Sequence, residues 1–212
     1  MPHSPRSRRE VLSKCFAAGF LISAPPLSET RALALWEAAE SRTLTPTPPN
    51  DLGPFYKPDA PRMNMLSRAK DMGLPLVVSG TVFDSRGNAL PAANLEIWQA
   101  DPSGQYDKTG FHYRAQFPAG QDGNYTFETN MPGHYPRRVC QHIHYKVTAP
   151  GHKALITQLY FATDPALEGD PDRNYRKDPV LRSRELIRPV TIFADPQSIR
   201  AAVQFEIVLE PA

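Results

Sequence analysis

The stretch CQHIHYKV, Cys140 to Val147, carries two histidines one residue apart in a segment that we predict to be a β-strand. Successive side chains of a strand point to opposite faces, so His142 and His144 share a face and lie roughly 6–7 Å apart. Two imidazoles at this spacing can bind one ion, and imidazole suits zinc, copper, iron and nickel. An ordinary surface or core pair has the same pattern, so the neighbouring segments decide the interpretation.

Segments with a period of two surround this stretch and predict an all-β protein. The chain contains 23 prolines, which suit turns and strand edges better than helices. Short strands separated by turn signals predict an antiparallel β-sandwich. The expected strands are 76–84, 94–101, 123–130, 142–150, 154–162 and 202–210, and 183–193 is a further strand interrupted by Pro189. Residues 164–178 are expected to form a long loop.

The first 34 residues have the pattern of an export signal. A basic region with Arg8 and Arg9 precedes a short apolar run, and an Ala-x-Ala site ends at Ala34. The paired arginines resemble a twin-arginine signal, and the apolar run is too short to span a bilayer. We therefore expect export to the periplasm or the medium, with no stable membrane insertion once the signal is removed.

Composition divides the rest of the chain into three parts. Residues 35–50 are expected to be a Thr/Pro-rich linker, 51–75 an N-terminal arm laid over the domain, and 76–212 a catalytic β-sandwich. The net charge is only +2, and no long basic run follows the N-terminus, so nucleic acid is not an expected partner.

Two cysteines are present, and Cys15 lies in the expected signal. Cys140 alone cannot form an intramolecular disulfide. It is either a small buried apolar residue or a nucleophile beside the histidines, and the first interpretation is favoured. No Gly-x-Ser-x-Gly or Walker-type loop indicates a serine hydrolase or a nucleotide enzyme.

Tyrosines near the histidine pair favour iron over zinc. Phenolate is a hard, strongly donating anion that suits a ferric ion, and a bound metal lowers the pKa of a coordinating group. Two phenolates and two imidazoles would leave a position open for hydroxide. The candidate tyrosines that precede the pair are Tyr106, Tyr113, Tyr125 and Tyr135.

Five motifs, in order along the chain, resemble those of the intradiol ring-cleavage dioxygenases, the protocatechuate 3,4-dioxygenase and catechol 1,2-dioxygenase type. The motifs are LGPFY (52–56), LEIWQADPSGQY (95–106), DGNYTFETNMPGHYP (122–136), HIHYKV (142–147) and LITQLYF (155–161). The resemblance implies a β-sandwich core with an N-terminal arm and a non-haem Fe(III) cofactor. It further implies cleavage of a catechol by O2, between the two hydroxyl-bearing carbons, to a muconate-type diacid.

Site residues follow from the resemblance. The implied iron ligands are Tyr106, Tyr135, His142 and His144. Tyr113 is the rival for the first tyrosine position, whereas Tyr125 alternates with Phe127 and is expected in the core. Tyr135 is the ligand expected to leave the metal and accept a substrate proton.

The resemblance also assigns residues that do not bind the metal. Arg138 is expected to stabilise negative charge, Gln158 to orient the reacting species, and Gly53, Pro54 and Tyr56 to line the substrate side. The family usually has arginine three residues before the first histidine, where this chain has Val139. A bulge could restore the aim of Arg138; otherwise the cation is lost, or Arg137 supplies it.

Two other functions compete with this interpretation. A strand, a glycine turn and a strand also begin non-catalytic transthyretin-like binding modules, although those lack the two tyrosines and His-x-His in this order. A zinc or copper hydrolase or oxidase would use the same histidines. The sequence leaves open which catechol is the substrate and whether the protein forms a homo-oligomer.

Overall fold

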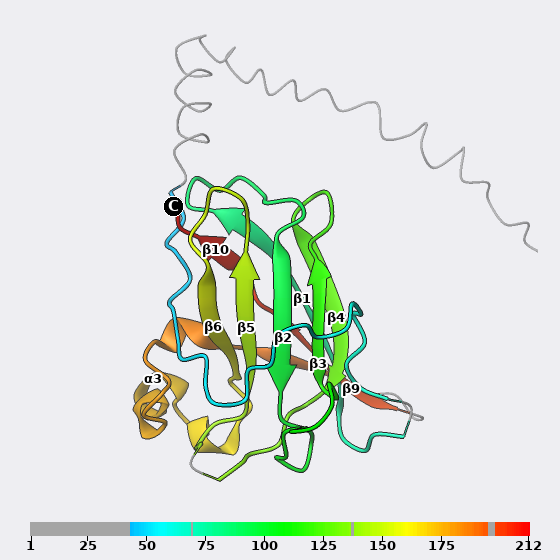
Figure 1. Cartoon of the computed structure of the whole chain (residues 1–212). Coiled ribbons are helices and arrows are strands. Elements are labelled where there is room, and N and C mark those ends of the chain that lie inside the picture. The colour runs from blue at the N-terminus through cyan, green and yellow to red at the C-terminus, as the bar shows by residue number, and fades with distance from the viewer. Residues whose placement is uncertain (1–42, 69, 137, 195–197) are drawn as a thin grey trace, which may run out of the picture. The chain divides into compact units, whose positions relative to one another are not determined.

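The alternating segments form two five-stranded sheets in the computed structural model of the chain (Figure 1). The structure describes residues 43–212 except 69, 137 and 195–197. The expected signal peptide (1–34), residues 35–42 of the expected linker and Arg137 therefore lie outside the described residues.

The first sheet is built around a long strand, β1. Two strands run parallel to it along one edge, and β4 runs antiparallel along the other. The parallel neighbours of β1 (Pro75–Asp84) are β9 (Ile199–Gln204) and β10 (Ile207–Leu209). Strand β8 (Val190–Ala194) pairs with β9, and the antiparallel neighbour of β1 is β4 (Asn124–Asn130).

The second sheet carries the histidine pair on its central strand, β5. In spatial order it contains β3 (Arg114–Pro118), β2 (Asn94–Gln99), β5 (His142–Thr148), β6 (Leu155–Phe161) and β7 (Ile187–Arg188). The antiparallel register sets His144 opposite Trp98 of β2 on one side and Gln158 of β6 on the other. This register brings three polar or aromatic side chains from separate segments into one row.

The predicted β-sandwich is confirmed, but the sheets are mixed rather than purely antiparallel, because β9 and β10 pair with β1, and β7 with β6, in parallel. The predicted last strand is wrong in one respect, since 202–210 is divided between β9 and β10. The amide of Phe205 bonds to the carbonyl of Ser79 at this break. The carbonyl of Phe205 lies where a Cβ at Gly80 would sit, so only glycine fits at that position of β1.

Short elements account for the other differences. Strand β3 was not expected, and the segment around Pro189 divides into β7 and β8, which belong to different sheets. The expected loop 164–178 contains short helical turns. They are η1 (Pro165–Leu167), α3 (Pro171–Asn174) and η2 (Tyr175–Lys177), and η3 (Arg184–Leu186) follows the loop. The side chains of Asp164 and Asp170 cap the first two turns.

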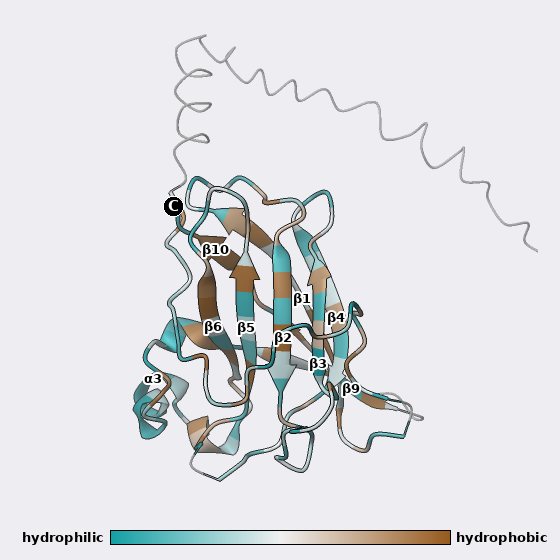
Figure 2. Cartoon of the chain, viewed as in Figure 1, coloured by the Kyte–Doolittle hydropathy of each residue, from teal (hydrophilic) through white to brown (hydrophobic). Residues whose placement is uncertain are grey.

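The two faces of β5 have different surroundings. Ile143, Tyr145 and Val147 are buried in the main core between the sheets. Figure 2 shows the matching alternation along β2, where hydrophobic and hydrophilic bands follow one another. On the opposite face, Trp98 and Tyr106 form a second buried cluster beneath residues of the N-terminal arm.

The arm, cyan in Figure 1, passes over the sheet that contains β6, β5 and β2. The amide of Asn50 bonds to the carbonyl of Ile156, and Arg114 donates to the carbonyl of Phe55 at 2.6 Å. These bonds fix the arm over a sheet face that would otherwise be open to water. No helix in the described part of the chain is long and apolar enough to cross a membrane.

Candidate metal centre

His142 presents one ring nitrogen to the site in a defined tautomer. Its Nδ1 lies 2.8 Å from the carbonyl of Cys140, which can only accept, so Nδ1 carries the proton. Its Nε2 lies 3.1 Å from Nη1 of Arg138, which can only donate, so Nε2 keeps its lone pair. A backbone carbonyl that fixes the tautomer in this way is typical of metal-binding histidines.

His144 is held between the sheet and the arm. Its ring stacks on Trp98, with 4.8 Å between centroids and 7° between planes. Its Nδ1 is buried and has no hydrogen-bond partner. A Cβ at Gly53 of the arm would lie 3.1 Å from Cε1 of this ring, and Gly53 has a φ of +72°. A glycine is therefore required where the arm covers the imidazole.

Tyr106 and Tyr135 reach the same place from two loops. Their rings meet edge to face with centroids 5.4 Å apart; Tyr106 lies 6.4 Å from the ring of His144, and Tyr135 lies 5.7 Å from that of His142. The loops approach each other at Gly104, where a Cβ would clash with the carbonyl of His134. The turn residue Gly104 thus permits the two phenols to converge.

The other two candidate tyrosines have different surroundings. Tyr125 is buried in the main core and donates to the carbonyl of Phe205, as expected for a structural residue. Tyr113 also belongs to the main core, where its hydroxyl donates to Asn130 at 3.2 Å. The structure therefore brings Tyr106, rather than Tyr113, beside His144.

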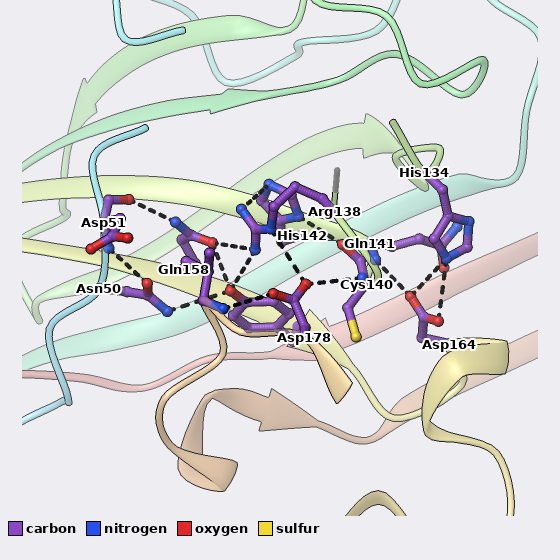
Figure 3. Close-up of polar contacts among 12 residues, drawn as sticks. Asn50, Asp51, His134, Arg138, Cys140, Gln141, His142, Gln158, Asp164 and Asp178 are labelled. Carbon is purple, nitrogen blue, oxygen red and sulfur yellow. Dashed lines mark hydrogen bonds and ion pairs between the residues drawn. The ribbon is translucent and has the colours of Figure 1, made fainter. Parts of the chain in front are cut away.

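Arg138 reaches the histidines despite its position four residues upstream (Figure 3). Its Nη2 donates to Oε1 of Gln158 at 3.0 Å and to the hydroxyl of Tyr160 at 2.7 Å. Gln158 in turn donates to the carbonyl of Asp51 at 2.6 Å. Both ends of the Gln158 amide are engaged, so in this arrangement it ties the arm to Arg138.

A cavity of about 480 Å³ leads from the surface to the phenols and the guanidinium. Its lining residues are Pro54, Phe55, Gly104, Gln105, Tyr106, Lys108, Tyr135, Pro136 and Arg138.

Of the three arm residues expected on the substrate side, only Pro54 lines this cavity. Gly53 packs on His144, and the hydroxyl of Tyr56 is held by Glu96 and Lys146 on the outer face of β2 and β5. Phe55, which the sequence analysis did not single out, stacks on Tyr106 with centroids 4.2 Å apart. No periodicity distinguishes adjacent aromatic residues in an irregular arm, so only the fold separates Phe55 from Tyr56.

Burial dominates the electrostatics of the site. It lowers the pKa of His142 to about 3, with the Arg138 charge as the next cause, and lowers that of His144 well below its usual value. Burial also raises the pKa of Tyr106 well above its ordinary range, and Tyr135 raises it further. The histidines are therefore neutral near pH 7, and a cation is needed to make the Tyr106 phenolate accessible.

These residues fit a ferric ion. The Tyr106 hydroxyl is buried without a hydrogen-bond partner beside Tyr135 and His144, and phenolate and imidazole donors together suit this ion. A metal at Nε2 of His142 would replace one of the Arg138 hydrogen bonds and leave the others in place. No group of three His, Cys, Asp or Glu that could hold a metal occurs among the described residues, so a metal at the two histidines would need other donors, such as the two phenols.

Cys140 has no role as a nucleophile in this geometry. The thiol is buried, and burial raises its pKa to about 12. Its carbonyl orients His142, and its amide donates to Asp178 at 3.0 Å. The residue acts through its backbone.

Comparison with known proteins identifies the family. A family model described as "Dioxygenase" matches residues 52–211, and a hydroxyquinol 1,2-dioxygenase from Nocardioides simplex is 32% identical over 186 residues. The chain belongs to the intradiol ring-cleavage dioxygenase family. The alignment to the Nocardioides protein covers 76% of this intradiol dioxygenase chain and 63% of the relative.

Other relatives carry related names. A catechol 1,2-dioxygenase from Candida albicans is 33% identical over 146 residues, which cover 56% of this chain and 48% of the relative. This family member thus spans about half to three-fifths of the length of these two curated proteins.

Solved structures of intradiol dioxygenases have the same fold. The dioxygenase domain of a dioxygenase–carbohydrate-binding fusion from a Streptomyces species has a TM-score of 0.68 at 36% identity, covering 79% of this chain and 100% of that one. Catechol 1,2-dioxygenase from Pseudomonas arvilla has a TM-score of 0.67 at 25% identity, covering 85% of this chain and 67% of that one.

Proposed function

We propose that this protein is a non-haem Fe(III) dioxygenase that cleaves a catechol between its hydroxyl-bearing carbons with O2, giving a muconate-type diacid. One observation carries the proposal. Two phenols and two imidazoles from separate segments converge at the inner end of a cavity, where the Tyr106 hydroxyl is buried without a hydrogen-bond partner. Catechol and O2 together contain the atoms and electrons of the diacid, so no further reductant is required.

The proposed ligands are Tyr106, Tyr135, His142 and His144. When bound, ferric iron supplies a Lewis acid that holds the catecholate and draws electron density from its ring, which makes the ring susceptible to O2. Neutral histidines and phenolates suit this hard trivalent ion, and their charges offset most of its own.

Tyr135 is the proposed proton acceptor. A catechol that binds through both oxygens must lose two protons, and a hydroxide can take one. The Tyr135 phenolate takes the other at its hydroxyl oxygen, which faces the cavity beside Arg138. Tyr106 is more deeply buried and remains in place.

Arg138 is the proposed source of positive charge for the reacting ring. It lines the cavity, and its guanidinium stays fixed through Gln158 and Tyr160. A preoriented cation in a site of low dielectric stabilises negative charge that develops in the transition state. Gln158 contributes by holding the guanidinium and the arm, while Pro54 and Phe55 form an apolar wall for the ring.

Oxygen uptake by the iron-loaded protein, measured over a panel of catechols with product identification, tests the proposal. The expected result is one O2 consumed for each catechol, with a ring-opened diacid as product. An iron-free, colourless protein that folds normally and consumes no O2 would instead favour a transthyretin-like binding module. Activity with zinc but not iron would favour a hydrolase.

Export is a separate part of the proposal and rests on residues 1–34 alone. The paired Arg8 and Arg9, the short apolar run and the Ala-x-Ala site support a twin-arginine signal that carries an already folded, metal-loaded protein. Cell fractionation should find the wild-type protein outside the cytoplasm and the Arg8→Lys/Arg9→Lys variant inside it. Equal distribution of the two would contradict twin-arginine export.

A further inference from the structure

Arg138 lies closer to His142 than four residues of a regular strand would allow. In a regular strand, four residues span roughly 13 Å, so Arg138 would lie well beyond His142. Its Nη1 nevertheless lies 3.1 Å from Nε2 of His142. The chain must therefore turn between the two residues, and a turn in an irregular segment needs something to hold it.

Asp178 bonds to this turn at two points (Figure 3). Its Oδ2 accepts from Nε of Arg138 at 3.3 Å and from the backbone amide of Cys140 at 3.0 Å. Its Oδ1 accepts from the amide of Val180 at 2.9 Å, which fixes the carboxylate in its own loop. Val139, between the two bonded residues, is exposed on the surface.

The carboxylate is also the fixed partner of the guanidinium charge. Its side chain has no exposed surface, and that of Arg138 is only 7% exposed. Tyr160 and Gln158 hold the Nη2 end of the guanidinium, whereas Asp178 holds Nε. A buried pair of this kind restricts the guanidinium to one orientation, and the loss of one partner leaves a buried charge uncompensated.

We propose that Asp178 is a positioning residue for the ring-cleavage reaction: it holds the turn at 138–140 so that Arg138 reaches the site from four residues upstream. Asp178 directly follows η2 and lies 40 residues after Arg138 in the sequence, so it reaches the turn only through the fold. It acts through Arg138 and does not contact the substrate. The inference rests on the proposed function for its kinetic consequence.

Asp164 provides a matched control in the same region. It is also buried, and it accepts from the amide of Gln141 at 2.6 Å, one residue beyond Cys140. It also bonds to His134 and caps η1, but its hydrogen bonds include none to Arg138. Asp164→Asn therefore weakens a buried carboxylate anchor of the residue next to this turn while leaving the bonds of Asp178 to Arg138 and Cys140 intact.

The first test needs no metal. The Nε–H NMR signal of Arg138, assigned by its absence in Arg138→Lys, is followed in the metal-free protein. We expect a shift and faster hydrogen exchange in Asp178→Asn, and an unchanged signal in Asp164→Asn. An unchanged signal in Asp178→Asn would overturn the proposal. Because this readout does not depend on turnover, it separates failure of the positioning role from failure of the proposed function.

The second test uses the iron-loaded protein. Asp178→Asn should lower kcat about tenfold or more, with iron content and KM little changed, whereas Asp164→Asn should stay near wild type. In the Arg138→Ala background, Asp178→Asn should have no further effect, so the double variant Arg138→Ala/Asp178→Asn should be no slower than Arg138→Ala alone. Additive losses, or equal losses in Asp164→Asn and Asp178→Asn, would overturn the proposal.

A conservative variant covers the case in which Asp178→Asn does not fold. Asp178→Glu keeps the charge but moves the carboxylate by one methylene, so it should fold and show an intermediate loss of kcat. Wild-type kcat in this variant together with an unshifted Arg138 signal would contradict a positioning role.

Discussion

Buried tyrosines lie on both faces of the sheet that contains β5, but they have different neighbours. On the inner face, the phenol of Tyr145 lies in the main core with that of Tyr125, whose hydroxyl donates to a backbone carbonyl. On the outer face, the phenol of Tyr106 is equally enclosed but has no partner for its hydroxyl. The hydroxyl of Tyr145 is also buried without a hydrogen-bond partner, so neither burial nor an unsatisfied hydroxyl by itself distinguishes a structural tyrosine from a candidate metal ligand. Tyr106 differs in its neighbours, because it lies beside Tyr135 and His144 and lines the cavity.

The arm makes this difference possible. The outer face of a sandwich sheet is ordinarily in contact with water, and the imidazoles on it would then be solvated. Here residues of the arm cover it and create a second buried layer, in which polar atoms are costly unless they are bound. Substitutions in the two layers, and a change of pH, should therefore have different effects.

The largest contrast is between neighbours on β5. His144→Ala should weaken iron binding by more than about 100-fold, because losing a direct ligand exceeds the cost of losing an outer partner. Tyr145→Phe, one residue away on the inner face, removes a hydroxyl that is buried without a hydrogen-bond partner, so it should leave iron content unchanged and should not lower the free energy of unfolding. Metal analysis and urea unfolding check both variants. Full iron content in His144→Ala would refute its role as a ligand.

The two buried phenols should respond in opposite ways. Tyr106→Phe removes an unpartnered hydroxyl, so the metal-free protein should lose no stability, but the colour of the iron-loaded protein should be lost or strongly shifted. Tyr125→Phe removes a hydrogen bond to the backbone and should cost about 1 kcal/mol of stability without changing the colour. Visible spectra and thermal unfolding measure these effects, and a colour change in Tyr125→Phe alone would reverse the assignment.

Substitution of two glycines with the same backbone conformation can distinguish the effect of backbone strain from the effect of contact with His144. Gly53 and Gly151 have φ values of +72° and +71°, but a Cβ would meet His144 only at Gly53 and nothing within 4 Å at Gly151. Alanine at either position should cost roughly 1–2 kcal/mol of stability. Only Gly53→Ala should also weaken iron binding, by about tenfold as for other changes beside a metal ligand. Equal iron affinities would show that the arm does not position the imidazole.

A further contrast is a dependence of stability on pH in the metal-free protein. The folded-state pKa of His142 is about 3, below the ordinary value near 6.5, and that of His144 is also lowered. The unfolded state then binds more protons, so stability is lost as the pH falls below about 6.5, with about 1.4 kcal/mol per pH unit for each histidine. Asp178, whose pKa lies below 3.8, contributes only at lower pH.

Urea unfolding at pH 7 and pH 5 measures this dependence. His142→Ala should reduce the slope by about half, because one of the two titrating groups is removed. A stability that does not change between pH 7 and pH 5 would mean that the histidines are accessible to water and that the arm does not enclose them.

Sequence periodicity was sufficient for the sandwich and for most strands, because alternation reports directly which face is buried. It did not predict β3, a five-residue strand that ends at Pro118, or the break at Phe205. That break depends on Gly80, more than a hundred residues earlier. Parallel pairing with β1 likewise arises from tertiary contacts that a local pattern does not contain.

The candidate site could likewise be predicted only in part from the sequence. The strand period alone put the two histidines on one face, and the resemblance added Tyr106 and Tyr135, which the structure brings to the same place. The sequence left open whether Arg138 reaches the site, because the turn that directs it is held by Asp178, which lies 40 residues further along the chain. Phe55 lines the cavity in place of the predicted Tyr56 because of the path that the irregular arm takes. Contacts of this kind become visible only once the chain is folded.

The visible absorption spectrum of the iron-loaded protein, recorded before and after anaerobic addition of catechol, tests the central claim most directly. We expect a tyrosinate-to-iron charge-transfer band with one iron per chain, and a new catecholate band when catechol is added. The first band should be lost or strongly shifted in Tyr106→Phe. A protein that binds iron without such a band, or whose spectrum is unaffected by catechol, would contradict the proposed ferric site.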